Sequence, residues 1–318
     1  MHSKSLLAGM LIAAAVMTGP AQAQYPDKPI NYILAFAPGG ESDISARFQQ
    51  PIFERLFKQQ AVIKYQAGAG GAQAWSQLNS MPGDGYTIMG TNLPHIVLQP
   101  IEKDVGYKTD DLTNVYFFHY TPDAIFVPAD SKFKTLKDLI DFAKKNPGQV
   151  TFAGSGSFTS NHLAQQRLDE LAGIKTTYVP FSGSGPSISA VLGNQVTAGF
   201  NYSTTFLNQP GKVRMLAVAS EKRLPTQPDA PTFKELGIDL VGGAYRGLAV
   251  PKSTPENVRK QVSDLLGKIN KDPEFVKKMQ DAGFVLADIS YEQMGKFMQE
   301  KKAEYGALAK KLGIGQKK

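Results

Sequence analysis

The sequence predicts an α/β fold built on a mainly parallel sheet, and three observations support this prediction. Short apolar runs with the composition of strands alternate with longer segments of helical periodicity along most of the chain. Turns rich in Gly and Ser join several of these strands to the helices that follow. The chain has no cysteine, so its stability has to come from a large core rather than from disulfides. Its length, at about 150 residues per domain, favours two domains.

The N-terminus has the pattern of a secretory signal peptide over residues 1–23. Lys4 precedes an apolar stretch at 6–17, and Ala-Gln-Ala at 21–23 forms an A-x-A cleavage site. A retained membrane anchor would need roughly 20 consecutive apolar residues, and a Gly-Pro pair interrupts this shorter run. We therefore expect an exported protein whose mature chain begins at Gln24, without stable membrane insertion.

The net charge of +7 lies mainly toward the C-terminus. Residues 255–318 contain 13 Lys or Arg against 9 Asp or Glu, in a region of helical pattern. Because aromatic residues do not alternate with these basic ones, we interpret them as a solvated helical face and expect no nucleic-acid partner. The remaining body is only mildly positive, which suits an anionic small ligand.

The elements follow one another in a regular order. Strands are expected at 30–37, 62–65, 86–90, 124–127, 150–153, 177–180, 196–200 and 213–219. Helices are expected at 42–57, after the Gly-rich turn at 67–72, within 135–148, and at 162–171 and 187–192. The helix at 42–57 has an apolar stripe of Ile44, Phe48, Ile52 and Leu56, and Pro51 is expected to kink or split it. In the helix within 135–148, Thr135 and Asp138 form a capping box.

The tail after Gly247 reads as one strand, GLAVP, followed by helices and a short strand at 284–286. Too little strand remains there for an independent domain, so we expect the tail to complete an earlier one. Apolar side chains near helical spacing predict core packing rather than a cofactor site: Met294, Phe297, Met298, Tyr305, Leu308 and Leu312.

Gly- and Ser-rich strand-to-helix turns lie at 37–43, 153–162 and 180–187, and a fourth Gly-rich turn lies at 67–72. A helix N-terminus presents unpaired N–H groups and a partial positive charge, so it binds anions without a cationic side chain. In an open α/β sheet such turns lie at the carboxyl ends of the strands, where ligands bind. Similar turns also serve only to reverse the chain, so both roles remain open for each of them.

The motifs of enzymes and nucleotide sites are missing from this sequence. It contains no G-x-G-x-x-G or P-loop signature, no G-x-S-x-G nucleophile elbow and no H-E-x-x-H. His2 lies in the signal peptide, and His95, His119 and His162 are scattered. We therefore expect no enzyme, no metal and no cofactor.

Seven segments, taken together, resemble one family. They are YPDKPINYILAFAPGGESDISAR, AGAGG, MPGDGYTIM, FAGSGSFTSNHLA, VPFSGSGPSISAVLGNQV, RMLAVASEKRLPTQPDAPTFKELG and GLAVPKSTP. In this order and spacing they resemble the Bug family of periplasmic substrate-binding proteins, which serve tripartite tricarboxylate transporters. The likeness covers essentially all of residues 25–305.

The resemblance implies a two-lobed periplasmic-binding-protein fold of type II, the Venus-flytrap fold. Each lobe is then a mainly parallel sheet flanked by helices, and two strands cross between the lobes. Lobe 1 is expected to comprise residues 24–122 plus 247–318, and lobe 2 residues 123–246. The resemblance also implies that a ligand carboxylate lies against the turn after the first strand, while a loop of the second lobe closes over it.

The implied site can be placed on this sequence residue by residue. The turn is Pro38-Gly39-Gly40 with Ser42 and Asp43, and Asp43 either caps the loop or contacts the ligand or its water. The facing loop provides Ser155, Ser157, Thr159, Ser160 and His162, where His162 either satisfies loop groups or lies near the ligand. The remaining residues expected around the cleft are Gly70, Asn92, His95, Phe181, Ser182 and Asn201.

This chain departs from the family pattern at three places. An acidic residue is common where this chain has Thr197 and Asn201, P-Y-K-G is common at 180–183, and an aromatic or apolar residue is common at Arg246. Less negative charge and a guanidinium near the hinge favour a second anionic group on the ligand, because Arg binds carboxylates in bidentate fashion. Arg246 is therefore a candidate second anchor, and the alternative is a surface or interlobe ion pair.

The resemblance implies a monomeric periplasmic protein that binds a small organic carboxylate, with a di- or tricarboxylate favoured. It would deliver the ligand to the large and small membrane subunits of the transporter. Two alternatives remain: a ligand sensor that feeds a periplasmic signalling domain, and an exported hydrolase on a similar fold.

Overall fold

The computed structural model describes residues 25–316, and the predicted signal peptide lies outside them. The strands are β1 (Ile30–Leu34), β2 (Ala61–Tyr65), β3 (Thr87–Leu93), β4 (Thr113–Pro128), β5 (Thr151–Gly154), β6 (Thr177–Pro180), β7 (Ala198–Tyr202), β8 (Val213–Val218), β9 (Gly243–Val250) and β10 (Val285–Ile289). The helices are α1 (Glu41–Phe57), α2 (Ala72–Trp75), α3 (His95–Glu102), α4 (Leu136–Lys145), α5 (Ser160–Ala172), α6 (Ser184–Leu192), α7 (Thr205–Asn208), α8 (Glu256–Asn270), α9 (Pro273–Asp281) and α10 (Tyr291–Lys311). Within the described part of the chain, no helix has the length and hydropathy to span a membrane.

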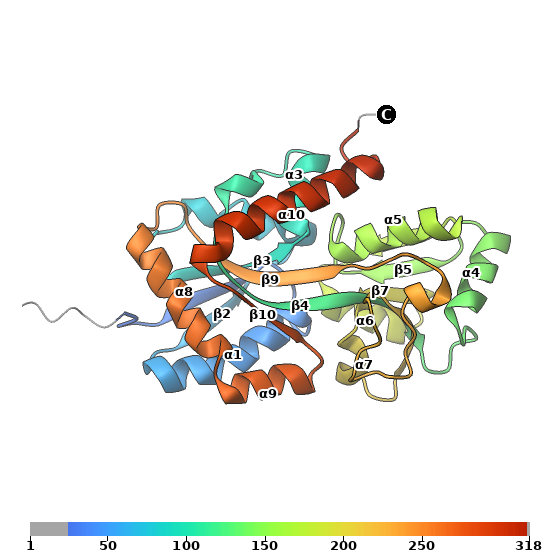
Figure 1. Cartoon of the computed structure of the whole chain (residues 1–318), viewed down its shortest axis with the longest axis horizontal. Helices are drawn as coiled ribbons and strands as arrows, with labels where there is room; N and C mark the ends of the chain where they lie inside the picture. Colours follow the sequence, from blue (N-terminus) through green and yellow to red (C-terminus); the bar gives the residue numbers. More distant parts are fainter. Residues whose placement is uncertain (1–24, 317–318) are drawn as a thin grey trace, which may run out of the picture.

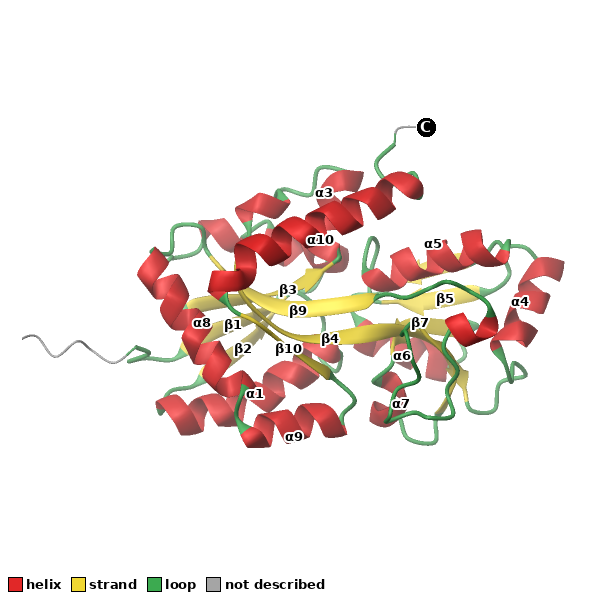
Figure 2. Ribbon diagram, in the orientation of Figure 1, coloured by secondary structure: helices red, strands yellow, loops and turns green. Residues whose placement is uncertain are grey.

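The strands form one sheet in the order β2-β1-β3-β9-β4-β7-β5-β6, with β8 and β10 also paired to β4. Its two ends are parallel: β1 pairs with β2 and β3, and β5 pairs with β6 and β7. Between them, β4 and β9 run antiparallel to each other. Figures 1 and 2 show these two long strands joining a lobe with α1, α8 and α9 to a lobe with α4, α5, α6 and α7. The predicted two-lobed α/β architecture is thus observed.

Strand β4 belongs to both lobes. Its residues from Thr113 to Pro122 pair with β9, and those from Asp123 to Pro128 pair with β7 and β8. A second crossing lies beside it, because the Asp123 N–H donates to the Gly242 carbonyl at 3.0 Å. The sequence predicted only the second-lobe part of β4, at 124–127. The first part was missed because its polar and apolar residues do not alternate, and tertiary packing buries both of its faces.

Helix α1 begins directly after the Gly39-Gly40 turn and continues past Pro51, so of the two effects expected of this proline, a kink or a split, the split does not occur. Proline removes one backbone hydrogen bond, whereas burial of Ala46, Ile52 and Phe53 holds the turns on either side of it. The expected stripe is also shifted, since Leu56 is 38% exposed.

Two local predictions are confirmed. Thr135 and Asp138 form the capping box of α4: the Asp138 N–H donates to Thr135 Oγ1 at 3.2 Å, and the Thr135 N–H donates to Asp138 Oδ2 at 2.9 Å. The apolar face of α10 packs into the core of the first lobe, where Met294 and Tyr305 are buried. This helix of the C-terminal tail therefore packs on the same core as α2, α3 and β3.

Candidate functional site

The turn between β1 and α1 is held by Asp43. Its Oδ2 atom accepts a hydrogen bond from the Gly39 N–H at 2.8 Å. Its Oδ1 atom accepts from Arg47 Nε at 2.8 Å and from the Tyr65 hydroxyl at 2.7 Å. Gly39 has a φ of +79°, a conformation that favours glycine. The carboxylate of Asp43 is thus occupied within the first lobe, where it determines the shape of the turn.

The N-terminus of α1 meets the second lobe directly. Gly40 is the N-cap and has no side chain with which to cap the helix. Instead, the Glu41 N–H donates to the Ser184 hydroxyl oxygen at 3.1 Å, across the cleft. Next to it, the Ala37 N–H donates to the Ser182 carbonyl at 3.0 Å. The two glycine loops at 37–43 and 180–187 therefore lie against each other, with the lobes in contact.

A second contact between the lobes involves the turn at 67–72 and the loop after β5. A Cβ atom on Gly156 would lie 2.7 Å from Gly70 Cα, which shows how closely the two backbones approach. The Gln99 amide nitrogen donates to the Gly70 carbonyl at 2.9 Å and lies 3.4 Å from the Ser157 carbonyl. All four Gly-rich turns are thus found at the boundary between the lobes.

The loop that precedes α5 satisfies most of its polar groups internally. Ser155 donates through its hydroxyl to Asn161 Oδ1 at 2.6 Å, and Thr159 donates to the Gly156 carbonyl at 2.8 Å. Ser160 donates to Asp123 Oδ1 at 3.0 Å. His162 accepts the Phe158 N–H at its Nδ1 atom, 3.1 Å away. Burial lowers the pKa of His162 to about 4, so the ring is neutral near pH 7.

A buried ion pair lies at the centre of the cleft. Arg246 Nη1 is 3.7 Å from Glu41 Oε2, and both side chains are at most 5% exposed. The guanidinium carbon lies 4.2 Å from the ring centre of Tyr202, and the Thr204 hydroxyl donates to Glu41 Oε1. Burial raises the pKa of the Glu41 carboxyl, and the charge of Arg246 acts in the opposite direction. Two side chains of lobe 2, Tyr202 and Thr204, therefore enclose a pair carried by α1 and β9.

The histidines around this pair are neutral. His95 and His119 are fully buried, and burial followed by the charge of Arg246 keeps the pKa of each well below its usual value. His95 packs edge-on against the rings of Phe36 and Trp75. Neither ring nitrogen of His95 has a hydrogen-bond partner among the described residues.

A cavity of about 10 Å³, roughly the size of one water, remains beside the ion pair. Five of the residues predicted from the sequence line it: Gly40, Ser42, Asn92, Ser155 and Arg246. Three further polar residues complete it, Glu41, Ser184 and Tyr202. The structure therefore brings the predicted turn, the predicted loop and Arg246 together at one point.

Other predicted residues lie farther from this cavity. Asn201 is buried and donates to Ser187 Oγ at 2.6 Å, and Phe181 packs against the second-lobe core. Gly70 and Ser157 belong to the second interlobe contact. Thr159, the N-cap of α5, accepts the His162 N–H through its side chain. Gly39 and Asp43 shape the turn between β1 and α1, and Ser182 contacts it from the second lobe.

Sequence reasoning missed Glu41, Ser184, Tyr202 and Asp123. Glu41 lies within the GGESD stretch at 39–43. The signal that could have identified it is an acidic side chain next to glycines that are expected to bind an anion. Ser184 lies in the recognised loop at 180–187. No local signal marks Tyr202 or Asp123, because each lies in an ordinary apolar strand.

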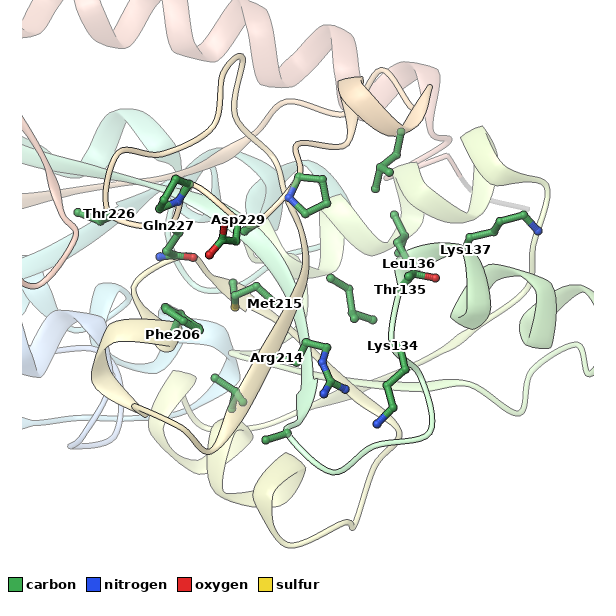
Figure 3. A pocket seen from close by; sticks show the side chains of 17 residues that line it. Lys134, Thr135, Leu136, Lys137, Phe206, Arg214, Met215, Thr226, Gln227 and Asp229 are labelled. Carbon is green, nitrogen blue, oxygen red and sulfur yellow. The ribbon is translucent and has the colours of Figure 1, made fainter.

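A much larger cavity lies elsewhere, in the second lobe (Figure 3). Its volume is about 780 Å³, and it is an open groove between the start of α4, strand β8 and the segment 226–231. Figure 3 shows Lys134 and Arg214 on one side of it and Gln227 and Asp229 on the other. None of the predicted site residues line this groove. Cavity size alone does not identify the functional site, and the polar residues that meet between the lobes are the better candidate.

Comparison with known proteins identifies the family of this chain. The model of the TctC family, described as the tripartite tricarboxylate transporter family receptor, matches residues 46–314. Protein BugT of Bordetella pertussis is 30% identical over 267 residues, which cover 81% of this chain and 82% of BugT. The solved structure of the periplasmic binding protein BugD has a TM-score of 0.85 and 28% identity and covers 91% of this chain and 99% of BugD. A Rhodopseudomonas palustris structure with adipate has the same TM-score of 0.85 at 23% identity, with 91% and 99% coverage, and so shows the shared fold. The resemblance is thereby confirmed, and the chain belongs to the TctC family of receptors of tripartite tricarboxylate transporters.

Proposed function

We propose that this protein captures a small organic carboxylate between its lobes and delivers it, as a monomer, to the large and small membrane subunits of a tripartite tricarboxylate transporter. In this proposal, lobe 1 comprises residues 24–122 plus 247–318, and lobe 2 comprises residues 123–246. The proposal extends the periplasmic solute-binding role of the family to a particular site in this chain.

The observation that carries the proposal is the N-terminus of α1. Its N-cap is a glycine, and within residues 25–316 the acceptor of the Glu41 N–H is Ser184 of the opposite lobe. When the lobes part, this N–H loses the Ser184 oxygen. A carboxylate can replace that acceptor, favoured by the partial positive charge of the helix end.

Lobe closure then completes the site. Ser184 lines the same cavity from the second lobe, so a bound carboxylate would receive donors from both lobes. Hydrogen bonds to a charged group contribute roughly 1.5–3 kcal/mol each. Several of them, less the cost of ordering and desolvation, reach the roughly 8 kcal/mol of a micromolar site. The R. palustris protein with adipate supports the view that this fold can enclose a dicarboxylate.

The finer expectation of a di- or tricarboxylate depended on Arg246 as a free second anchor. Glu41 lies 3.7 Å from that guanidinium and balances its charge. This contact removes the original reason to require a second anionic group, and the proposal is therefore stated for a carboxylate in general.

A thermal-shift screen of the mature protein tests the proposal. A ligand at 100 times its Kd should stabilise the protein by about 2.7 kcal/mol, so mono-, di- and tricarboxylates and amino acids should separate into binders and non-binders. Uptake of a labelled binder into vesicles that contain the two membrane subunits should require the protein. If no carboxylate of any class raised the melting temperature, the proposed function would be wrong.

A further inference from the structure

The cleft contains a carboxylate and a guanidinium side by side, and neither is fully satisfied by the protein. Glu41 Oε2 and Arg246 Nε have no hydrogen-bond partner among residues 25–316. Glu41 Oε2 lies 3.7 Å from Arg246 Nη1, and both residues line the cavity where the turn and the loop meet. The two groups therefore offer one acceptor and one donor to whatever enters this space.

The charges around the cavity leave no excess of positive charge. Arg246 is a permanent cation, and Glu41 is its nearest carboxylate. His95 and His119 are neutral, for the reasons given above. Asp123 is a further buried carboxyl group, bound by Ser160 and Asn161. Asp123 lies outside the lining of this cavity and beside Arg167, so the charges that the cavity itself presents are those of Arg246 and of Glu41, ionised next to it, and the two balance each other.

This balance discriminates between solutes. A plain carboxylate that reaches Arg246 has to share the guanidinium with Glu41, which leaves one negative charge uncompensated in a water-poor site. An uncompensated buried charge is strongly unfavourable. A solute that brings a cation with its carboxylate leaves both charges of the protein paired.

We infer, building on the proposed function, that the solute is a zwitterion whose carboxylate, held at the N-terminus of α1, also binds Arg246 and whose protonated amine binds the Glu41 side chain, the chemistry of an amino acid. The two protein groups lie 3.7 Å apart, so a solute whose carboxylate and ammonium are separated by a single carbon atom can contact both of them. On binding, the Glu41–Arg246 pair is exchanged for two pairs between protein and solute, without a change in net charge. Thr204 and Tyr202 hold the two protein side chains from the opposite lobe.

Matched ligand pairs test the inference on the unmodified protein. Suitable pairs are L-alanine and propionate, L-leucine and 4-methylpentanoate, L-phenylalanine and 3-phenylpropionate, and L-glutamate and glutarate. Calorimetry should give, for at least one pair, an affinity at least 10-fold higher for the amino acid. N-acetylation of that amino acid, which removes the ammonium, should abolish the preference.

Glu41→Gln tests the residue itself. It keeps an oxygen for Thr204 and removes the charge, so affinity for the amino acid should fall at least 10-fold while that for the matched acid stays equal or rises. Glu54→Gln is the control, since Glu54 is exposed on the same helix and should leave both affinities unchanged. A structural effect of Glu41 would instead lower both affinities equally, which would overturn the inference.

The outcomes separate this inference from the proposed function. If carboxylates without an amine bind as tightly as their amino counterparts, the inference is wrong and the receptor function stands. If no carboxylate and no amino acid binds, both are wrong. The matched ligand pairs test the inference on the wild-type protein, so the test does not depend on whether Glu41→Gln folds.

Discussion

Gly185 of the second lobe lies against Pro38 of the first lobe with no room for a side chain between them. A Cβ atom on Gly185 would be 2.7 Å from the Pro38 carbonyl oxygen and 3.0 Å from the Gly39 carbonyl carbon. Both of these atoms belong to the backbone of the other lobe, so they cannot yield as the end of a flexible side chain would. Glycine at 185 is therefore required by the contact between the lobes.

Gly185→Ala should consequently impair closure rather than folding. Gly185 lies in the first turn of α6 with ordinary backbone geometry, where alanine is intrinsically favourable. We expect the free energy of unfolding without ligand to change by less than about 1 kcal/mol, while ligand affinity falls at least 10-fold. Urea unfolding and calorimetry measure the two quantities.

Gly306→Ala is the matched control for this substitution. Gly306 lies in α10, and a Cβ atom there would have no heavy atom within 4 Å. Alanine should stabilise the helix by up to about 1 kcal/mol and leave ligand affinity unchanged. Equal ligand affinities for Gly185→Ala and Gly306→Ala would contradict the close contact across the cleft.

Asp43→Ala should destabilise the first lobe and weaken ligand binding. The substitution removes the acceptor for the Gly39 N–H, Arg47 and Tyr65. We expect a loss of about 2–4 kcal/mol in the free energy of unfolding, because the Gly39 N–H is left without its partner. Asp141→Asn, which breaks an exposed pair with Lys137, should cost less than about 0.5 kcal/mol. A similar cost for both variants in urea unfolding would show that Asp43 does not hold the turn.

Asp123 should make the protein less stable as the pH rises. Burial raises the pKa of Asp123 to about 7, although hydrogen bonds from Ser160 and Asn161 and the charges of Arg246 and Arg167 act against it. Between about pH 4 and pH 7 the folded state then binds more protons than the unfolded state, so this group's contribution to stability falls as the pH rises. Asp123→Asn should be nearly equal to wild type at pH 4 and more stable at pH 8, by up to about 4 kcal/mol. A constant difference across this range would rule out the buried carboxyl as its cause.

His162 should have the opposite pH dependence. Its pKa of about 4 lies below that of an unfolded histidine, 6.5, because the ring is buried. The unfolded state binds more protons between these values, so stability is lost as the pH falls from 6.5 to 4, by up to about 3 kcal/mol. His95 and His119 contribute with the same sign. Comparing unfolding curves of wild type and His162→Gln across this range isolates its share, and parallel curves would contradict the prediction.

Many elements of the fold could be predicted from the sequence because their signals are local. The capping box of α4 depends only on Thr135 and Asp138, which are three residues apart. In α10, the helical spacing of the apolar residues identifies the face that is buried. The strands before each Gly-rich turn were recognisable for the same reason. The order of the glycine motifs also pointed to the family, and this was confirmed.

Local signals failed where distant segments decide the conformation. The first part of β4 is a strand because β9 and β10 pair with it, and these strands come from the tail of the chain. Pro51 suggested a broken helix, yet burial of the flanking residues keeps α1 continuous.

By itself, the sequence determined the α/β class, the glycine turns and the family, and it led us to expect a carboxylate ligand. Only the tertiary structure decided how Arg246 is used. Its partner, Glu41, is on another element, and the two meet because α1 starts at the edge of the sheet where β9 crosses between the lobes. Buried charges act on whatever is nearest in space rather than in sequence. Among the described residues, the oppositely charged group nearest to Arg246 is a carboxylate of the protein itself, Glu41, which changes the solute that we propose the cleft to prefer.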